Sequence, residues 1–409
     1  MRRPLTVPVT DEALPAGDFS RERLAGYDPA VLDRAVVLVV GAGALGQNLL
    51  ISLALCGIRE LRIVDNDLFE PHNRTRSPLY PTRAEQTALG LEKARVAAAK
   101  LGPLMPASRP RVRFAVTRIQ ELGLGAFHGV HAVASCVDNP RARAHLADAT
   151  RLLAIPLIEG GFEGPEITLS SFPAETTRTA SSAPCWRCSH DDLAGVFSCR
   201  FTAENAEAHG VIPAIQPAAA TLAGLQAETT IMALHGRDAL GGHAFDLNLR
   251  TGRSRLTRLT TDPRCAGAHR TLPRQRVQLR TRAEDTVADL LDELRDRLGE
   301  GAEIRLRDPF VLTAPCHECR TTVDVWQPSD RWASTPLCDD CGGTRPRSGA
   351  TSPVAEVLPT LDRLASTEIQ TASCATLGIA PMDILDITSD RAPAAVRVAG
   401  TTSDLFEAA

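Results

Sequence analysis

Lysine is almost missing from this chain. Its 409 residues include 45 basic ones, but only Lys93 and Lys100 are lysines. Such a bias is typical of GC-rich coding. It is also what a protein-modifying enzyme would show if it avoided lysines that it could modify. Under either interpretation, a lysine close to a candidate site is a residue of interest.

The sequence also lacks an excess of basic charge. Its net charge is -4 at pH 7, and 44% of its residues are hydrophobic against 23% that are charged. This is the composition of an ordinary globular protein. Because a dedicated nucleic-acid binder needs a basic surface, we predict no nucleic-acid partner. Recognition is expected to depend on local sites.

No segment has the pattern of an export signal or a membrane span. Residues 1–8 contain no apolar core of the kind that a signal peptide needs. The uncharged stretches 35–58 and 211–227 contain glycine, proline or glutamine, which favour segments buried within a protein. Most of the eleven cysteines lie in or near Cys-x-x-Cys pairs, which favours metal-bound thiolates over disulfides. We therefore expect a cytoplasmic protein with no membrane partner.

Short β-rich runs alternate with helical stretches along the first 160 residues. Strands are expected at 36–40, 61–64, 112–119, 132–136 and 156–160, with helices from 44, over 83–101 and over 141–153. This alternation predicts parallel strands joined by crossover helices, a doubly wound, Rossmann-like α/β sheet. Further strands (167–172, 245–249, 255–259) and a helix near 212–235 follow, with an irregular segment at 174–210.

A glycine-rich turn follows the first expected strand. Gly41, Gly43 and Gly46 form a Gly-x-Gly-x-x-Gly motif that opens a helix. Glycines allow the backbone to approach a phosphate, and a helix N-terminus offers free N–H groups to an anion. Asp65 ends the next strand, where a carboxylate can accept hydrogen bonds from ribose hydroxyls. The pattern predicts a nucleotide site, which could so far belong to a nicotinamide-dependent enzyme.

The residues beyond Asp65 favour a triphosphate. Asp67, Asn73 and Arg76 follow the second strand, and Lys93 lies on the next expected helix. Guanidinium and ammonium groups suit a triphosphate better than a site of hydride transfer. Asp138 follows the fourth strand, where its carboxylate could hold Mg²⁺ against phosphate oxygens. It could instead serve only as the cap of the next helix.

Five motifs in this order and spacing resemble a known family. Gly-x-Gly-x-x-Gly, Asp-x-Asp, Asn-x-x-Arg, Gly-x-x-Lys and Cys-x-Asp-Asn, within residues 16–270, are similar to the adenylating domain of the ThiF/MoeB/HesA family, in the ubiquitin-activating superfamily. The resemblance implies an enzyme that uses ATP and Mg²⁺ to adenylate the C-terminal carboxylate of a small ubiquitin-fold protein, or of a peptide. It implies a ribose ligand in Asp65, phosphate contacts in Arg76 and Lys93, and a magnesium-associated aspartate in Asp138.

The same resemblance extends to the segment 18–22. This segment is similar to one whose arginine crosses into the active site of the partner subunit, although Phe19 and Glu22 replace the family's tyrosine and glutamine. Arg21 is therefore a catalytic candidate, and the resemblance implies a homodimer.

One set of four cysteines predicts a zinc ribbon. Cys316 and Cys319 form one Cys-x-x-Cys pair, and Cys338 and Cys341 form a second. The spacing between the pairs is typical of a self-contained Zn²⁺ site.

Cys185 and Cys188 need other partners. The resemblance implies that a second pair follows a strand hairpin, and this sequence has Cys265 and His269 at that place. We therefore expect a second Zn²⁺ site made by these four residues. In the alternative, Cys185 and Cys188 share a metal with one of the later pairs, and no separate ribbon exists.

Cys199 is the candidate nucleophile for a transfer step. It lies in the irregular segment beside Arg200, whose positive charge favours a thiolate. Family members that accept the activated carrier as a thioester, or handle its sulfur, place a cysteine in this region. The usual position is occupied by Asn205 here. Cys199 is therefore either a shifted catalytic thiol or an unreactive loop residue.

We expect five parts along the chain: an N-terminal arm with Arg21 (1–34), an ATP-binding adenylation domain (35–274), a small βαβ-like appendage (275–312), the zinc ribbon (313–345) and a C-terminal tail (346–409). The predicted function is ATP- and Mg²⁺-dependent adenylation of a small ubiquitin-like or sulfur-carrier protein that ends in glycine. A conjugating enzyme or a sulfurtransferase would be a further partner.

Three alternatives remain open. The first is activation of a sulfur carrier or a peptide for the biosynthesis of a cofactor or natural product. A more remote alternative is an NAD-dependent oxidoreductase, which Asn73, Arg76 and Lys93 disfavour. The last is a zinc-ribbon adaptor without enzymatic activity.

Overall fold

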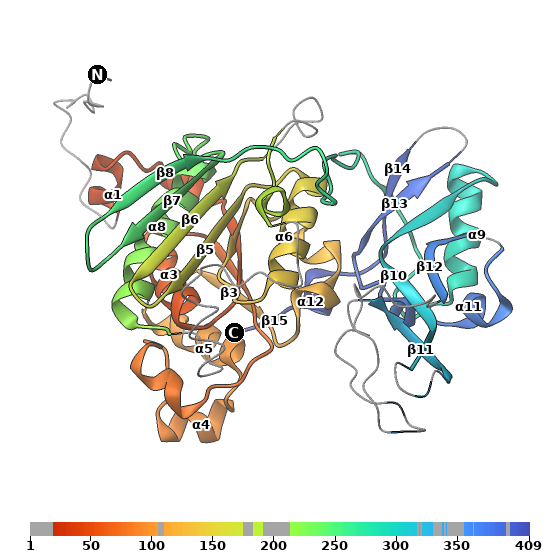
Figure 1. The fold of residues 1–409 in the computed structure, drawn as a ribbon, viewed down its shortest axis with the longest axis horizontal. Helices are drawn as coiled ribbons and strands as arrows, with labels where there is room; N and C mark the ends of the chain where they lie inside the picture. The colour runs from red at the N-terminus through yellow and green to blue at the C-terminus, as the bar shows by residue number, and fades with distance from the viewer. Residues whose placement is uncertain are drawn as a thin grey trace. The chain divides into compact units, whose positions relative to one another are not determined.

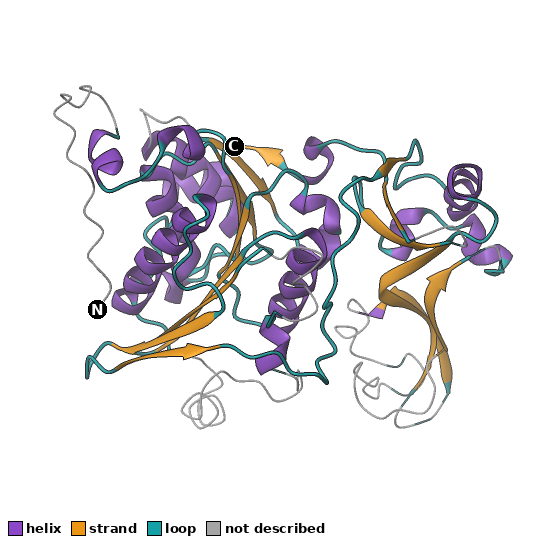
Figure 2. Cartoon of the chain, turned by 90° about the horizontal axis from the view of Figure 1, so that it is seen from above, coloured by secondary structure: helices purple, strands orange, loops and turns teal. Residues whose placement is uncertain are grey.

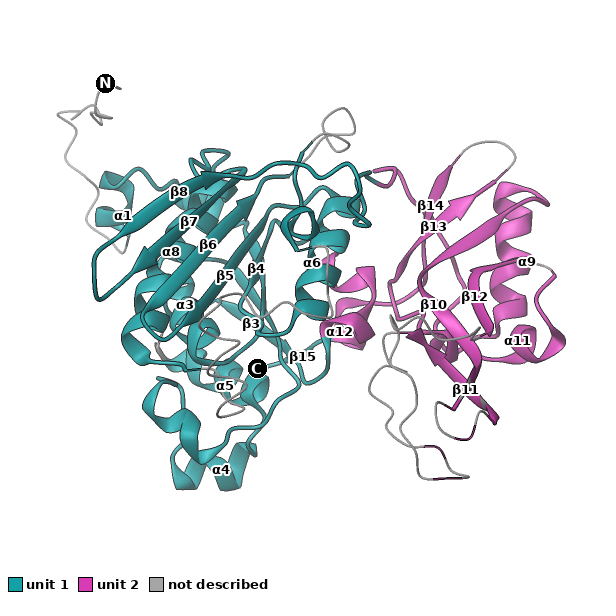
Figure 3. Ribbon diagram, in the orientation of Figure 1, with its two compact units in different colours: residues 1–118, 129–271, 406–409 teal, residues 119–128, 272–405 magenta. Residues whose placement is uncertain are grey.

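The computed structural model describes residues 19–104, 110–174, 183–190, 213–316, 319, 321–329, 338, 341, 356–362, 364–389 and 393–409. The chain divides into two compact units (Figure 3). Unit 1 comprises residues 1–118, 129–271 and 406–409, and unit 2 comprises residues 119–128 and 272–405.

Unit 1 is built on a nine-stranded sheet, ordered β15-β3-β2-β1-β4-β5-β6-β7-β8 (Figure 1). Its strands are β1 (Val36–Val40), β2 (Glu60–Val64), β3 (Arg111–Ala115), β4 (Ala132–Ser135), β5 (Leu157–Glu163), β6 (Glu166–Phe172), β7 (His243–Asn248), β8 (Ser254–Arg258) and β15 (Glu407–Ala408). Strands β3, β2, β1, β4 and β5 are parallel. The order reverses beside β1, which confirms the doubly wound, Rossmann-like arrangement.

Helices cover both faces of this sheet (Figure 2). The helices described in this unit are α1 (Ser20–Leu24), α2 (Pro29–Leu32), α3 (Ala44–Leu55), α4 (Arg83–Leu89), α5 (Lys93–Leu104), α6 (Pro140–Leu153) and α8 (Gln216–Leu234), with 3₁₀ turns η1 (Pro71–Thr75) and η4 (Trp186–Ser189). Helices α3 and α8 pack against each other over β1 and β5. Strand β1 and helix α3 supply much of the buried core, including Val37, Val39, Leu49 and Leu53. Parallel strands buried on both faces explain the continuous apolar runs in the sequence.

The single helix expected over 83–101 is two helices. Gly90 has a φ of +80°, which ends α4, and α5 begins at Lys93. A left-handed residue is tolerated there because glycine has no Cβ. The break places Lys93 at the start of a helix instead of within one.

Unit 2 contains a six-stranded sheet, ordered β11-β10-β13-β14-β9, with β12 also paired to β10. Its elements are β9 (Val277–Gln278), α9 (Val287–Leu298), β10 (Glu303–Pro315), β11 (Thr322–Pro328), β12 (Glu356–Leu361), α11 (Thr367–Thr371), η5 (Cys374–Leu377), β13 (Ile384–Thr388), β14 (Ala394–Arg397), α12 (Thr402–Leu405), η2 (Ile119–Leu122) and η3 (Leu124–Phe127).

The expected βαβ-like appendage is not a self-contained element. Strand β9 pairs in parallel with β14, and β10 pairs with β13, so β9 and β10 are not neighbours. The segments 275–312 and 313–345 therefore share one sheet with much of 346–409. Helix α9 has a capping box between Thr286 and Asp289 and buries its leucines against this sheet.

Residues Ile119–His128 belong to unit 2 although they lie in sequence between β3 and β4. Buried Asp383 holds this segment by accepting hydrogen bonds from the backbone nitrogens of Leu124 at 2.7 Å and Ile384 at 2.9 Å. Burial raises the pKa of Asp383, against the effect of Arg307 and these backbone donors. Among the described residues, no helix is long and apolar enough to cross a bilayer.

Candidate nucleotide site and metal centres

The glycine-rich turn lies at the carboxyl end of β1 and leads into α3. A Cβ on Gly41 would lie 2.5 Å from the carbonyl oxygen of Cys136, and one on Gly46 would lie 1.8 Å from the carbonyl oxygen of Gly41. A Cβ on Gly43 would meet no atom within 4 Å. The outer glycines are thus required by close packing, whereas the middle one leaves space for a ligand to approach the backbone.

Asp65 is bound directly to this turn. Its carboxylate accepts hydrogen bonds from the backbone nitrogens of Ala42 at 2.6 Å and Asp67 at 2.7 Å. Burial raises the pKa of Asp65, while these donors and Lys93 act in the opposite direction. Its position at the end of β2 is the one predicted for the ribose ligand.

Lys93 and Asp67 form an ion pair beside Asp65. The Lys93 Nζ lies 2.8 Å from Asp67 Oδ2, and the lysine side chain is only 13% exposed, against 58% for the aspartate. The Lys93 backbone nitrogen also donates to the Asp67 carbonyl at 2.9 Å. The structure therefore brings together three residues that the sequence separates by 28 positions.

Asn73 lies on η1, and Arg76 directly follows it. The Asn73 side-chain oxygen accepts from the backbone nitrogen of Glu70 at 2.9 Å, so it caps this 3₁₀ turn. The Arg76 guanidinium donates to the carbonyl of His72 at 2.9 Å. Both side chains thus make local contacts in this structure.

Gln47 is a site residue that the sequence analysis did not single out. It is fully buried on α3, where its amide nitrogen donates to the Ala42 carbonyl at 2.8 Å. Its oxygen accepts from the backbone nitrogen of Leu79 at 2.9 Å. Gln47 therefore links the glycine-rich turn to the segment after Arg76. In the sequence, Gln47 is distinguished only by its polar side chain within an apolar stretch.

Asp138 lies exposed after β4, in a loop beside Gly41. The cap of α6 is its neighbour Asn139, whose side-chain oxygen accepts from the Ala142 nitrogen at 2.8 Å. The interpretation of Asp138 as the helix cap is therefore wrong. Its carboxylate faces solvent at the carboxyl edge of the parallel strands.

The loop that carries Asp138 is held by a half-buried arginine. Arg143 donates to the Val137 carbonyl from Nε at 3.1 Å and from Nη2 at 2.9 Å. It also pairs with buried Glu159 of β5 at 3.2 Å. Neither residue stood out in the sequence, because each looks like an ordinary charged side chain until β5 and α6 pack together.

Arg21 does not lie with these groups. It is on α1, and the preceding Phe19 packs its ring 3.0 Å from a Cβ placed on Gly57, just past the C-terminal end of α3. The glycine-rich turn is at the other end of this 12-residue helix, about 18 Å away at 1.5 Å per residue. Tyr27 bonds to Glu228 and holds the segment on α8.

Cys185, Cys188, Cys265 and His269 form one cluster. The Cys185 sulfur lies 3.8 Å from that of Cys188, 3.7 Å from that of Cys265 and 3.6 Å from His269 Nε2. The Cys188 sulfur is 3.4 Å from the same nitrogen. Tetrahedral zinc with Zn–S bonds of about 2.3 Å places its sulfurs roughly 3.8 Å apart. The donor set and its spacing therefore fit a Zn²⁺ ion.

Cys316, Cys319, Cys338 and Cys341 form a second cluster at the end of the β10–β11 hairpin. The sulfurs of Cys316 and Cys341 are 3.6 Å apart, and those of Cys319 and Cys338 are 3.8 Å apart. All four sulfurs lie within 4.8 Å of one another, so this group could also hold a metal ion. Cys185 and Cys188 do not lie with any of these four cysteines.

Cys199, the candidate nucleophile, lies outside the described residues.

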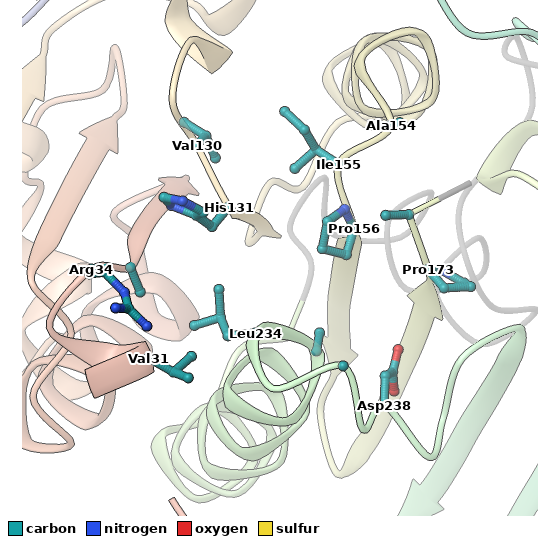
Figure 4. A pocket seen from close by; sticks show the side chains of 14 residues that line it. Val31, Arg34, Val130, His131, Ala154, Ile155, Pro156, Pro173, Leu234 and Asp238 are labelled. Atoms are coloured by element: carbon teal, nitrogen blue, oxygen red, sulfur yellow. The ribbon is translucent and has the colours of Figure 1, made fainter. Parts of the chain in front are cut away.

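A cavity of about 640 Å³ lies elsewhere in unit 1 (Figure 4). Its walls include Arg34, His131 and Pro156, which precede β1, β4 and β5. The cavity is thus at the amino edge of the parallel strands, opposite the edge that carries Asp65 and Asp138. Of the predicted site residues that the structure describes, none lines it.

Comparison with known proteins identifies the family. The model of the ThiF family matches residues 24–267, which is more than half of the chain. The chain belongs to the ThiF family. This confirms the resemblance drawn from the five motifs and the fold expected from it.

Curated relatives match part of this ThiF chain. The adenylyltransferase and sulfurtransferase UBA4 of Eremothecium gossypii is 33% identical over 157 residues, 38% of this chain and 33% of that protein. The adenylyltransferase and sulfurtransferase MOCS3 of Arabidopsis thaliana is 27% identical over 182 residues, 44% of this chain and 37% of that protein. The chain thus spans about a third of the length of these relatives.

Among solved structures, E. coli MccB with MccA-N7isoASN has a TM-score of 0.51 at 17% identity, covering 63% of this chain and 76% of that one. At this identity the similarity concerns the fold alone.

Proposed function

We propose that this ThiF-family chain is an ATP-dependent adenylyltransferase that activates the C-terminal carboxylate of a small ubiquitin-like or sulfur-carrier protein. The observation that carries the proposal is the grouping of the glycine-rich turn, Asp65, the Asp67–Lys93 pair and the Asp138 loop at one edge of the sheet. The names of the curated relatives, which pair adenylyltransferase with sulfurtransferase, favour a sulfur carrier.

The proposed chemistry needs charge neutralisation more than proton transfer. A carboxylate oxygen attacks the α-phosphorus of ATP, and the bond to pyrophosphate breaks. The nucleophile is already ionised at neutral pH, so no general base is required. Asp65 would bind the ribose, while Lys93 and Arg76 would bind phosphate oxygens and position them for in-line attack. Arg76 would have to exchange its bond to the His72 carbonyl for the phosphate.

Asp138 is the proposed Mg²⁺ ligand. A single exposed carboxylate suits an ion that keeps several waters and phosphate oxygens as its other ligands. When bound there, Mg²⁺ would offset charge on the phosphates. The contribution of the chain itself is the fixed position of the Asp138 loop, which Arg143 holds through the Val137 carbonyl.

The two cysteine clusters are proposed as structural Zn²⁺ sites. Each offers four protein ligands, three cysteines and a histidine or four cysteines. Four protein ligands leave no position for a substrate, which is typical of a structural site.

We further propose a homodimer in which Arg21 acts in the active site of the partner. Support comes from its place at the far end of α3, away from the nucleotide edge of its own subunit. Cys199 is proposed to attack the adenylated carboxylate of the carrier as a thiolate, so that the acyl–phosphate bond breaks, AMP leaves and the carrier is held as a thioester. A peptide substrate, or a sulfur carrier used in biosynthesis, remains the alternative within the same chemistry.

The direct test is exchange of labelled pyrophosphate into ATP, with purified chain and small proteins that end in glycine. The proposal expects exchange that requires both a carrier and Mg²⁺, and no reduction of NAD with any substrate. If no carrier or peptide supports exchange while ATP itself binds, the adenylation proposal fails. A thiol-sensitive adduct that is lost in Cys199→Ala, with exchange retained, would support the transfer step.

A further inference from the structure

The four residues of the Cys185 cluster come from two distant loops. Cys185 directly precedes η4 and Cys188 lies within it, whereas Cys265 and His269 follow the β7–β8 hairpin. The two loops are about 80 residues apart in sequence. Thiolates brought this close also repel one another. Something besides the cysteines must therefore hold the loops together if the site is to exist before metal binds.

Asp148 of α6 contacts both loops. Its Oδ2 lies 2.9 Å from Nη1 of Arg187, which stands between Cys185 and Cys188. Its Oδ1 accepts a hydrogen bond at 2.8 Å from the backbone nitrogen of Ala268, which stands between Cys265 and His269. One carboxylate thus bridges the two pairs of ligands.

The surroundings of Asp148 favour this bridge. Its side chain and that of Arg187 are 21% and 20% exposed, so the pair is shielded from much of the solvent. A Cβ on Gly267 would lie 3.3 Å from Asp148 Oδ1 and 3.0 Å from the Cys185 sulfur. Glycine therefore lets the second loop approach both groups. One turn further along α6, Arg151 donates to the carbonyl of Pro184, just before Cys185.

We propose that Asp148 is a positioning residue for zinc, which sets the two ligand loops in register on α6. The proposal rests on the Zn²⁺ site proposed above. Preorganisation by the carboxylate lowers the conformational cost of assembling four ligands, so zinc is bound more tightly than the ligands alone would allow. Arg187 neutralises the carboxylate, so its charge does not oppose the thiolates.

The test measures zinc release from the full-length chain to a chromophoric chelator. Asp148→Ala should weaken binding of one zinc ion per chain by about tenfold, the low end for residues behind the metal ligands. Asp148→Asn should lie between this variant and wild type, because an amide oxygen can still accept from Ala268 but cannot pair with Arg187.

Two references make the measurement specific. The second zinc ion, in the cluster of Cys316, Cys319, Cys338 and Cys341, is the internal reference within each molecule. Asp246→Asn is the matched variant, since Asp246 also pairs with an arginine, Arg255, at 3.1 Å on β7–β8. Asp246→Asn should release both ions as wild type does.

Three results would overturn the inference. One is release from Asp148→Ala at the wild-type rate. Another is equal loss of both ions, since that would reflect general unfolding. The third is a wild-type chain that holds zinc at the Cys316 cluster alone, which removes the Cys185 site itself. These measurements need no carrier protein. A failure of this inference can therefore be told apart from a failure of the adenylation proposal.

Discussion

Lys93 and Lys100 lie on the same helix, yet they have different surroundings. Lys93 pairs with Asp67 beside the proposed ribose ligand, whereas Lys100 pairs with Glu85 at 3.0 Å. We predict that Lys93→Ala lowers the rate of pyrophosphate exchange by about a hundredfold, the scale of one lost charge-stabilising donor in a preorganised site. Lys100→Ala is the matched control and should retain most of the rate. Equal rates in the two variants would contradict the assignment of Lys93.

Asp65 should make ATP binding sensitive to a fall in pH. Burial raises its pKa above that of a free aspartate, so the carboxylate is lost at a higher pH than usual. The protonated group can no longer accept from both Ala42 and Asp67, nor from a ribose. We predict that the KM for ATP rises as pH falls through this raised pKa. Asp65→Asn should show a higher KM with this component of the pH dependence removed. If wild type and variant have parallel pH profiles, Asp65 is not the group that titrates.

At the scale of elements, α6 links both proposed sites. Asn139 caps its start beside Asp138, and Asp148 lies in its second half beside the cysteine loops. The sequence predicted this helix over 141–153, because its pattern is a local feature, but it offered Asp138 as the cap in place of Asn139. It did not predict the break at Gly90. In a sequence, a glycine that ends a helix with a positive φ cannot be told from a glycine that is tolerated within a helix.

The C-cap of α6 contains a strained residue. Ala154 has φ 54° and ψ 49°, the left-handed region that L-residues other than glycine rarely adopt. We predict that Ala154→Gly raises the free energy of unfolding by about 0.5–1 kcal/mol. Ala147→Gly, within the same helix, should instead lower it by at least about 1 kcal/mol. Chemical denaturation of both variants measures these changes, and a destabilised Ala154→Gly would show that the strain is absent.

At the scale of the whole molecule, residues distant in sequence complete each unit. Strand β15 pairs with β3 in unit 1, where Phe406 is 2% exposed and lies under the guanidinium of Arg62. We predict that Phe406→Ala lowers the free energy of unfolding of unit 1 by about 3–5 kcal/mol, through a cavity and a lost cation–π contact. Leu364→Ala, at a side chain that is 91% exposed, is the control and should have no measurable effect. A stable Phe406→Ala chain would mean that β15 contributes little.

The proposed dimer gives a separate prediction. Arg21→Ala and Lys93→Ala should each retain only a small part of the wild-type exchange rate alone. If Arg21 acts across the interface, mixed dimers contain one site with both residues intact. Subunit exchange in an equal mixture should then restore about a quarter of the wild-type exchange rate, because half the dimers are mixed and each has one complete site. No recovery after confirmed subunit exchange would place Arg21 in its own subunit or outside catalysis.

The amino-acid sequence by itself determined the features that depend on neighbours in the chain. The apolar run before Gly41, the spacing to Asp65 and the alternation of strands and helices are local, and they predicted the Rossmann-like sheet and the ThiF family. The nucleotide residues share one edge because parallel strands bring their carboxyl ends together.

Only the tertiary structure decided which distant groups meet. It placed Asp148 between the two loops of the Cys185 cluster, whose four members the family resemblance had already implied. It also buried Gln47 between the glycine-rich turn and the segment after Arg76. Such contacts form when helices pack on a sheet. They are stabilised by the burial of apolar surface and by hydrogen bonds throughout the core. No spacing between single residues encodes them.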